Sequence, residues 1–483
     1  MTIPLLINGE EILPSNSDPE STFPVVSPST HTIVHTCTSA SPAHASAALA
    51  AAQVAFSAWS RTTPAHRRNI IMKAADLLEA RAQELIKAMC DETGSQEGFA
   101  VFNVHTVAEQ MRDTAGRISG AVVGWVPQCA DEDTTAMVLK EPYGVVLGIA
   151  PWNAPYILGV RAVLCALAAG NTCILKGSEL SPLCYHHIGR AFTEAGLPPG
   201  ALNVIFTSRS ASPAITTQLI SAPEVKKINF TGSTAIGALI AAACGKALKP
   251  CLLELGGKAS AIVLEDADLD KAATACMLGA FLHAGQVCMS TERILVHEAV
   301  VDEFREKFKN AVAGFSPEAM VLVQGAGVEK NRVLVADALG KGAQLLTGHE
   351  YMKEEVHPET GKPSETRLKP IVVEGVTKEM RLYREESFGP SVSLTAVKSD
   401  DEAIEIANDS EYGLNSAVFT KDLSRGLRVA KRLECGNIHI NSMTIHDEAS
   451  LPHGGVKSSG WGRFNGSWAF DEFLRAKTIT FKA

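Results

Sequence analysis

Two side chains suited to covalent catalysis stand 34 residues apart, Glu254 and Cys288. A cysteine thiolate attacks a carbonyl carbon well and also leaves well from the thioester that it forms. A carboxylate is a group that acts as a general base toward water. Leu255-Gly256-Gly257 follows Glu254, and an acid in such apolar surroundings is unusual for a structural role because burying a lone charge is costly. Both residues also have a structural alternative: a buried thiol, and a locally paired carboxylate at a strand end.

Five segments carry these and other polar residues in a fixed order. They are Ala150-Pro151-Trp152-Asn153-Ala154-Pro155, Phe230-Thr231-Gly232-Ser233-Thr234-Ala235-Ile236-Gly237, Leu253-Glu254-Leu255-Gly256-Gly257-Lys258, Phe281-Leu282-His283-Ala284-Gly285-Gln286-Val287-Cys288-Met289-Ser290 and Glu385-Glu386-Ser387-Phe388-Gly389-Pro390. Each segment alone is a weak signal, since Gly-Ser-Thr is also an ordinary N-cap sequence. Taken together, in this order and at these spacings, the five segments resemble the aldehyde dehydrogenase superfamily. The resemblance runs from Ile7 to Ile479.

The resemblance implies NAD(P)-dependent oxidation of an aldehyde to a carboxylic acid, through a thiohemiacetal and then a thioester on Cys288. Asn153 would donate to the oxyanion of the adduct, with the backbone N–H of Cys288 as the second donor. Glu254 would activate the water that hydrolyses the thioester. A base there disfavours acyl transfer to coenzyme A, which stays an alternative together with a semialdehyde substrate. The alternative of another class is a catalytically silent binding or structural relative, and retention of all these residues argues against it.

The implied cofactor site lacks a GxGxxG fingerprint. Instead, Gly232 and Ser233 follow a predicted strand and open a helix, whose N–H groups suit a pyrophosphate. The resemblance places five further residues against the cofactor: Trp152, Lys176, Glu179, Glu386 and Phe388. Lys176 and Glu179 match contacts to the adenosine ribose, Glu386 would hold the nicotinamide ribose, and Phe388 would pack beside the nicotinamide or simply in the core. A carboxylate at 179 would accept from a 2′-hydroxyl and repel a 2′-phosphate, so NAD is expected, with NADP as the alternative.

Two segments look like the salicylaldehyde and vanillin dehydrogenase branch, namely 152–161 and 445–460. Ala154 would leave room for a flat ring. Arg161 lies eight residues after Asn153, a little over two helical turns, so the two are expected on one face. Arg161 would meet a phenolate or another polar substituent, or else pair with a neighbouring acid. His453 stands where the family commonly has Phe, which indicates a more polar pocket. The expected substrate is an aromatic or extended conjugated aldehyde with a polar group.

The elements that must position these residues alternate between strands and helices. Strands at 143–150 and 172–176, with a helix at 155–169 between them, start a pattern that reaches Leu255 and predicts a parallel sheet covered on both faces. Helices are expected at 43–60, 67–90 and 97–119, and a second α/β block runs over 260–440. The fold class is α/β and aldehyde dehydrogenase-like, with a Rossmann-type cofactor domain, an α/β catalytic domain and a small bridging or oligomerisation sheet.

The resemblance also implies the domain boundaries. Residues 1–119 and 143–255 would form the cofactor-binding domain, 120–142 a bridging segment and 256–455 the catalytic domain. Residues 456–483 would return to the cofactor domain and the bridging sheet. Because exposed strands invite pairing with another subunit, a homodimer or homotetramer is expected.

Composition limits the partners. The net charge of −9 argues against nucleic acid or an anionic membrane surface, and no apolar run reaches the roughly 20 residues of a membrane span. The 11 cysteines include no CxxC pair, so neither a disulfide framework nor a zinc site is expected. Reduced thiols in a cytoplasmic enzyme, acting on a small aldehyde without a metal, fit this composition.

Overall fold

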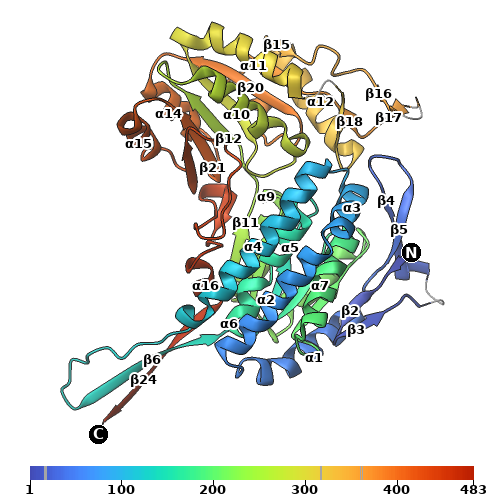
Figure 1. Cartoon of the computed structure of the whole chain (residues 1–483), viewed down its shortest axis with the longest axis vertical. Coiled ribbons are helices and arrows are strands. Elements are labelled where there is room, and N and C mark those ends of the chain that lie inside the picture. Colours follow the sequence, from blue (N-terminus) through green and yellow to red (C-terminus); the bar gives the residue numbers. More distant parts are fainter. Residues whose placement is uncertain (16–18, 316–317, 359–360, 362, 483) are drawn as a thin grey trace.

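The computed structural model describes residues 1–15, 19–315, 318–358, 361 and 363–482. Two α/β bodies, each built on a mostly parallel sheet, make up most of the chain, and a long two-stranded ribbon projects from them (Figure 1). Smaller sheets pair β1 (Thr2–Ile3), β5 (Ile33–Thr38) and β4 (Thr22–Val26), then β14 (Met320–Val321) with β18 (Arg367–Leu368), and β16 (Glu355–Val356) with β17 (Pro363–Ser364).

The first body holds an eight-stranded sheet in the order β23-β11-β10-β7-β8-β9-β2-β3. Its five central strands are parallel, and β23, β2 and β3 join antiparallel at the edges. Because both faces are covered, every residue of β7, β8 and β9 is buried, and β7 is apolar along its whole length. The bounds are β2 Leu5–Ile7, β3 Glu10–Ile12, β7 Val145–Ile149, β8 Thr172–Lys176, β9 Leu202–Ile205, β10 Val225–Thr231, β11 Cys251–Glu254 and β23 Gly460–Trp461.

Nine helices among the described residues belong to this body. They are α1 (Pro42–Trp59), α2 (Pro64–Ala80), α3 (Ala82–Thr93), α4 (Glu97–Ala121), α5 (Pro155–Arg161), α6 (Leu164–Ala169), α7 (Pro182–Ala195), α8 (Ser212–Ser221) and α9 (Thr234–Lys246). The helix expected at 67–90 is two helices, because Arg81 between them leaves the helical conformation at φ −104° and ψ 17°.

The helix expected at 155–169 is also two helices, α5 and α6. Asn229, on the neighbouring strand β10, donates its side-chain amide to the carbonyl oxygens of Arg161 and Ala162, at 3.3 and 3.0 Å. A side chain inserted into the carbonyl ladder in this way breaks a helix. The break ends α5 at Arg161, which places that guanidinium at a helix terminus.

The second body is a seven-stranded sheet in the order β15-β19-β20-β13-β12-β21-β22, parallel except for β15. Along β12, Ala261 and Val263 join one apolar cluster, and Ile262 joins another on the opposite face, as the alternation of a strand requires. The strands are β12 Ala259–Val263, β13 Thr291–His297, β15 Gln344–Thr347, β19 Ile371–Glu374, β20 Ser391–Val397, β21 Asn415–Phe419 and β22 Asn437–Ile440; the helices are α10 Leu269–Phe281, α11 Val301–Phe315, α12 Gly325–Gly340, α13 Arg381–Arg384, α14 Asp400–Asn408 and α15 Leu423–Ala430.

The ribbon joins β6 (Thr134–Pro142) to β24 (Leu474–Lys482), which follows the short α16 (Trp468–Glu472). The two strands pair antiparallel from Leu474 opposite Pro142 to Lys482 opposite Thr134. Figure 1 shows the ribbon extending away from both bodies, with the C-terminus at its tip. The return to this ribbon was expected to run to Ala483, which lies outside the described residues.

The sheet of the first body ends at an edge where the polar residues gather. In the register of its strands, Ile149 lies opposite Lys176, and Thr231 lies opposite Glu254. Ligands of open parallel sheets bind at this carboxyl edge. Within the described part of the chain, every helix is too short or too polar to cross a bilayer.

Candidate active site

The turn that presents Cys288 is strained. After α10, His283, Ala284 and Gly285 adopt positive φ angles of 51°, 57° and 70° in succession. Such angles cost free energy at non-glycine residues and persist only where the surrounding structure imposes them. A Cβ on Gly285 would lie 2.3 Å from the carbonyl oxygen of Gly389, so this position accepts glycine alone. The strained turn therefore fixes the direction in which the chain reaches Cys288.

The two glycines after Glu254 allow close approach to this turn. A Cβ on Gly257 would lie 2.3 Å from the carbonyl oxygen of Cys288. A Cβ on Gly256 would lie 2.8 Å from the carboxylate oxygens of Glu386. The segment that follows Glu254 is therefore held directly against Cys288 on one side and against Glu386, a candidate cofactor-binding residue, on the other.

Cys288 lies where two cavities meet. A larger cavity of about 430 Å³ is lined mostly by apolar side chains and also by Asn153, Arg161 and Glu254. A second cavity of about 250 Å³ is lined by Asn153 and Cys288 as well, together with Trp152, Glu386 and Phe388. A thiol shared by two cavities can contact two different molecules at once, which is the arrangement that a two-substrate reaction needs.

Asn153 is held beside Cys288 by a backbone contact. Its side-chain Nδ2 donates to the carbonyl oxygen of Gln286 at 2.9 Å. An amide nitrogen carries two hydrogens, so one N–H remains for an oxygen bound near Cys288. Because the side chain is buried, its position is fixed before any ligand arrives, as electrostatic stabilisation of an oxyanion requires.

Glu254 ends β11 and is almost completely buried, at 1% exposure. Both carboxylate oxygens lie 3.3 Å from Nη1 of Arg161, and Oε1 lies 2.9 Å from Nε2 of His453. Burial alone would raise the pKa of this carboxyl, but the charges of Arg161 and His453 outweigh burial and hold the pKa below its usual value. Glu254 is therefore a carboxylate at neutral pH.

The thiol of Cys288 is protonated at rest. Burial raises its pKa, and the negative charges of Glu254 and Glu386 raise it further. A neutral thiol is a poor nucleophile, so it must lose its proton when the reaction begins. The carboxylate of Glu254 lines the same cavity and is one group that can take that proton.

The smaller cavity has an aromatic wall. The rings of Trp152 and Phe388 meet edge to face with centroids 5.9 Å apart. Phe388 has a φ of 48°, and its backbone N–H donates to Glu292 at 3.2 Å, which fixes this strained residue. Glu386 accepts from the N–H of Gly257 at 2.8 Å, and burial together with Glu292 raises its pKa to about 7.

The start of α9 completes this cavity. Thr231, Gly232 and Ser233 line it, and Ser233 is the N-cap of a 13-residue helix. The side chain of Ser233 accepts from the N–H of Ile236. The other N–H groups of the first turn have no partner inside the helix, so they suit an anionic phosphate group. Aromatic wall, carboxylate and helix start together fit a dinucleotide.

Lys176 ends β8 and Glu179 follows it, at the same sheet edge but outside this cavity. Lys176 is buried, which lowers its pKa, while the nearby Glu179 carboxylate opposes that change. Glu179 lines a separate cavity of about 380 Å³ with residues of the N-terminal segment, including His31. The two residues are thus close to each other, and the structure brings five of the seven expected cofactor contacts into the cavity beside Cys288.

The three expected substrate residues differ in their positions. Ala154 and Arg161 both line the larger cavity. Asn153 lies in the turn before α5, which begins at Pro155, so the helical spacing argued for Asn153 and Arg161 is wrong although both face one cavity. Arg161 pairs with Glu254 and makes a very short contact with Asp447. Of the two predictions for this residue, pairing with a neighbouring acid is therefore the one that the structure shows.

His453 requires a correction. It was expected to make the substrate pocket more polar, but it is not among the described residues that line the larger cavity. Its ring contacts Glu254 instead, and its backbone pairs with Phe464. The sequence shows that a histidine replaces the usual phenylalanine, but it could not show which residue the histidine ring contacts.

Several residues at the site were not singled out from the sequence. Gln286 holds Asn153, Asp447 holds Arg161, Glu292 holds the N–H groups of Ser387 and Phe388, and Lys330 lines the smaller cavity. Gln286 and Asp447 lie inside segments that the sequence analysis recognised, so both could have been chosen as candidate site residues. Glu292 and Lys330 carry no local signal, because only the folded chain brings Glu292 to Ser387 and Phe388 and brings Lys330 to the smaller cavity.

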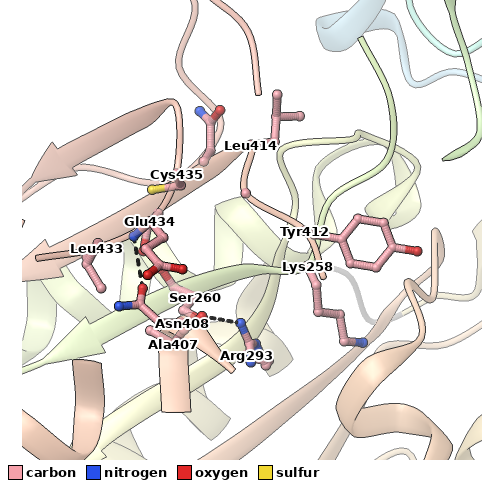
Figure 2. Close-up of a pocket in the computed structure, with 13 residues that line it drawn as sticks. Lys258, Ser260, Arg293, Ala407, Asn408, Tyr412, Leu414, Leu433, Glu434 and Cys435 are labelled. Atoms are coloured by element: carbon pink, nitrogen blue, oxygen red, sulfur yellow. Dashed lines mark hydrogen bonds between the residues drawn. The ribbon is translucent and has the colours of Figure 1, made fainter. Parts of the chain in front are cut away.

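A further polar cavity, in the second body, is separate from this site. Figure 2 shows its lining, where Arg293 donates to the carbonyl oxygen of Ala407 at 2.8 Å and Asn408 accepts from the N–H of Glu434 at 2.9 Å. Its volume of about 20 Å³ is room for one water molecule. It is too small for a substrate.

Comparisons with known proteins agree with this geometry. The aldehyde dehydrogenase family matches residues 15–479. A vanillin dehydrogenase of Pseudomonas sp. strain HR199 is 43% identical over 99% of this chain and 97% of the relative, and a salicylaldehyde dehydrogenase of Pseudomonas sp. strain C18 is 39% identical over 99% and 98%. The crystal structure of a salicylaldehyde dehydrogenase from Pseudomonas putida G7, complexed with salicylaldehyde, has a TM-score of 0.94 at 37% identity and covers 100% of this chain and 98% of that one. The chain therefore belongs to the aldehyde dehydrogenase family.

Proposed function

We propose that the protein oxidises an aromatic aldehyde to the carboxylic acid with NAD, using Cys288 as nucleophile, Asn153 as oxyanion donor and Glu254 as general base. The position of Cys288 between a 430 Å³ apolar cavity and a 250 Å³ cavity with the features of a dinucleotide site carries this proposal. The larger cavity would hold the aldehyde, and the smaller one the nicotinamide.

The chain's own groups account for the chemistry. The thiolate of Cys288 adds to the aldehyde carbon, and the free N–H of Asn153 donates to the resulting oxyanion. A bound nicotinamide cofactor supplies the hydride acceptor. Loss of hydride leaves a thioester on Cys288, and Glu254 takes a proton from the water that attacks it. The acid leaves, and the thiol is restored. The overall change is aldehyde plus oxidised cofactor plus water to acid, reduced cofactor and a proton.

The substrate class follows from the lining and charge of the larger cavity. Phe99, Phe102, Ile157 and Met443 give it apolar walls suited to a flat ring. Arg161 is the cation that lines it, but Glu254 and Asp447 together outweigh that charge. A carboxylate on the substrate would meet net negative charge, so we propose neutral aromatic aldehydes with hydroxyl or methoxy groups over semialdehydes.

The family uses NAD or NADP. We propose that this chain prefers NAD, because Glu179 beside Lys176 offers a carboxylate to a ribose 2′-hydroxyl and would repel a 2′-phosphate. Glu254 as a charged base also favours water over coenzyme A as the acyl acceptor.

We also propose the domain division given above, with 1–119 and 143–255 binding the cofactor, 120–142 forming the bridging segment and 256–455 carrying Cys288. Residues 456–483 return to the cofactor domain, where β23 pairs with β11, and then to the bridging sheet. The ribbon supports a homodimer or homotetramer, because a two-stranded ribbon alone is marginally stable and this one exposes Met137, Leu139, Ile479 and Phe481. A cytoplasmic location is supported by cysteines that are all free thiols.

The test is NADH and NADPH formation with salicylaldehyde, vanillin, benzaldehyde and hexanal, for wild type, Cys288→Ala and Cys129→Ala. Cys129 is a half-buried free thiol in the segment before β6, so its variant controls for loss of a cysteine. We expect turnover of the aromatic aldehydes, with NADH as the main product, by wild type and Cys129→Ala, and none by Cys288→Ala. A strong preference for hexanal, or an active Cys288→Ala enzyme, would overturn the proposal.

A further inference from the structure

His453 is held rigidly behind the general base. Its backbone N–H donates to the carbonyl oxygen of Phe464 at 3.0 Å, and the N–H of Phe464 donates back at 2.7 Å. The ring is buried, with Nε2 2.9 Å from Oε1 of Glu254 and Nδ1 3.4 Å from the side-chain amide of Asn437. A charged carboxylate has no proton to give, so Nε2–H is the donor in the contact with Glu254.

The contacts of the two oxygens of Glu254 differ. Oε1 accepts from both His453 and Arg161, whereas Oε2 accepts from Arg161 alone among the residues that the structure describes. Each carboxylate oxygen has two lone pairs, so Oε1 is filled and Oε2 keeps one lone pair free. Glu254, which carries this free lone pair, lines the larger cavity together with Cys288.

The titratable neighbours of Glu254 form a closed group. Arg161 approaches from the end of α5, Asp447 and His453 come from the segment after β22, and Cys288 comes from the nucleophile turn. Asp447 in turn accepts from Asn465 at 2.7 Å, so the partner that holds Arg161 is itself held. His453 is the member of this group that contacts Glu254 without also lining the substrate cavity.

We propose that His453 is a positioning residue for Glu254: with Arg161 it fixes Oε1, and it leaves Oε2 as the oxygen that takes the proton from water. This inference rests on the proposed function of Glu254 as the base for thioester hydrolysis. The hydrogen bond from His453 favours the charged form of the base, so it extends the pH range in which Glu254 is a carboxylate toward acid.

The test compares His453→Phe, which keeps the size of the ring and removes the donor, with His453→Gln, which restores an N–H donor. His105→Phe serves as control, because His105 is exposed on α4, where its ring lies beside Glu79 rather than Glu254. Each enzyme is studied with benzaldehyde for steady-state rate against pH, for the pre-steady-state burst of NADH, and by thermal melting to verify folding.

For His453→Phe we expect a burst of NADH followed by a steady rate about 10- to 100-fold lower, because hydrolysis slows while acylation continues. The acidic limb of the rate profile should move up by about one pH unit, since the pKa of Glu254 rises when the donor is lost. His453→Gln should restore part of both effects, and His105→Phe should match wild type.

A folded His453→Phe enzyme whose acidic limb coincides with that of wild type overturns the inference, as does a variant that loses the burst itself. A purely structural role would lower the melting temperature and the amount of active enzyme without moving the limb. Failure of wild type to reduce any cofactor would instead refute the proposed function, and the two failures are therefore distinguishable.

Discussion

Replacing Arg161 with Met should destabilise the fold without changing the preference between salicylaldehyde and benzaldehyde. Arg161 is buried between Glu254 and Asp447. The pKa of Asp447 is about 2, with burial opposed chiefly by Arg161, whereas an unfolded Asp has a pKa of about 3.9. That difference alone corresponds to about 2.5 kcal/mol at pH 7, and Glu254 adds to it. We expect Arg161→Met to lower the free energy of unfolding by about 3–5 kcal/mol, the usual loss when one partner of a buried ion pair is removed.

The pH dependence of this loss follows from the sign of the shifts. Both acids have lowered pKa values in the wild-type fold, so they contribute stability above the pKa of the unfolded chain and lose it as pH falls through the folded value. Without Arg161, burial raises both values, and the folded variant takes up protons that wild type does not. The deficit of the variant should therefore be largest near pH 7.5 and smaller near pH 5.5.

The measurement is urea unfolding at both pH values, beside kcat/KM for salicylaldehyde and benzaldehyde at pH 7.5. Arg117→Met is the matched control, because Arg117 forms a partly exposed pair with Asp113 on α4. A surface pair of this kind contributes about 0.5 kcal/mol. We expect the two aldehydes to lose kcat/KM in equal proportion in Arg161→Met.

A stable Arg161→Met protein that loses salicylaldehyde turnover and keeps benzaldehyde turnover would refute the reasoning. It would mean that Arg161 recognises the ring hydroxyl and that its contacts with Glu254 and Asp447 contribute little. Equal stability of variant and wild type at pH 7.5 would refute the electrostatic part alone.

Three further outcomes are expected. Gly257→Ala should lower kcat about 100-fold, because its Cβ would lie 2.3 Å from the carbonyl oxygen of Cys288 and displace the nucleophile, whereas Gly116→Ala, with open space around its Cβ, should leave the rate unchanged in the same steady-state assay. Glu179→Gln should raise the ratio of kcat/KM with NADP to that with NAD about tenfold, and an unchanged ratio would exclude contact with the 2′ position. Phe481→Asp should lower the molar mass in sedimentation experiments if the ribbon joins subunits, because a charge replaces an exposed apolar side chain on β24.

The sequence predicted the parallel sheets and the residues that meet at their carboxyl edge. Alternating strands and helices specify a covered parallel sheet, and such sheets bring the loops after each strand together. The recognised motifs then located Asn153, Glu254 and Cys288, which the structure places around shared cavities. Two of the motifs keep a glycine where a Cβ would collide with another backbone segment, at Gly257 and Gly285.

The helix boundaries and the partners of Arg161 could not be predicted from the sequence. The break after Arg161 depends on Asn229, 68 residues later, and its pairing with Asp447 depends on a residue 286 positions away. Helical periodicity depends on residues within a few turns, so it cannot indicate contacts with residues so far away in the sequence. The resemblance of its segment placed Arg161 near the substrate, but could not show that Glu254 and Asp447 already pair with its charge.

Specificity and base control are therefore coupled through one guanidinium. Arg161 lines the larger cavity and also donates to both oxygens of Glu254. A substrate with an anionic group that drew Arg161 toward itself would weaken the support of the base that must complete its own turnover. A neutral ring leaves the contact with Glu254 intact. The electrostatics of the base, as well as the apolar walls, thus favour neutral aromatic aldehydes in this cavity.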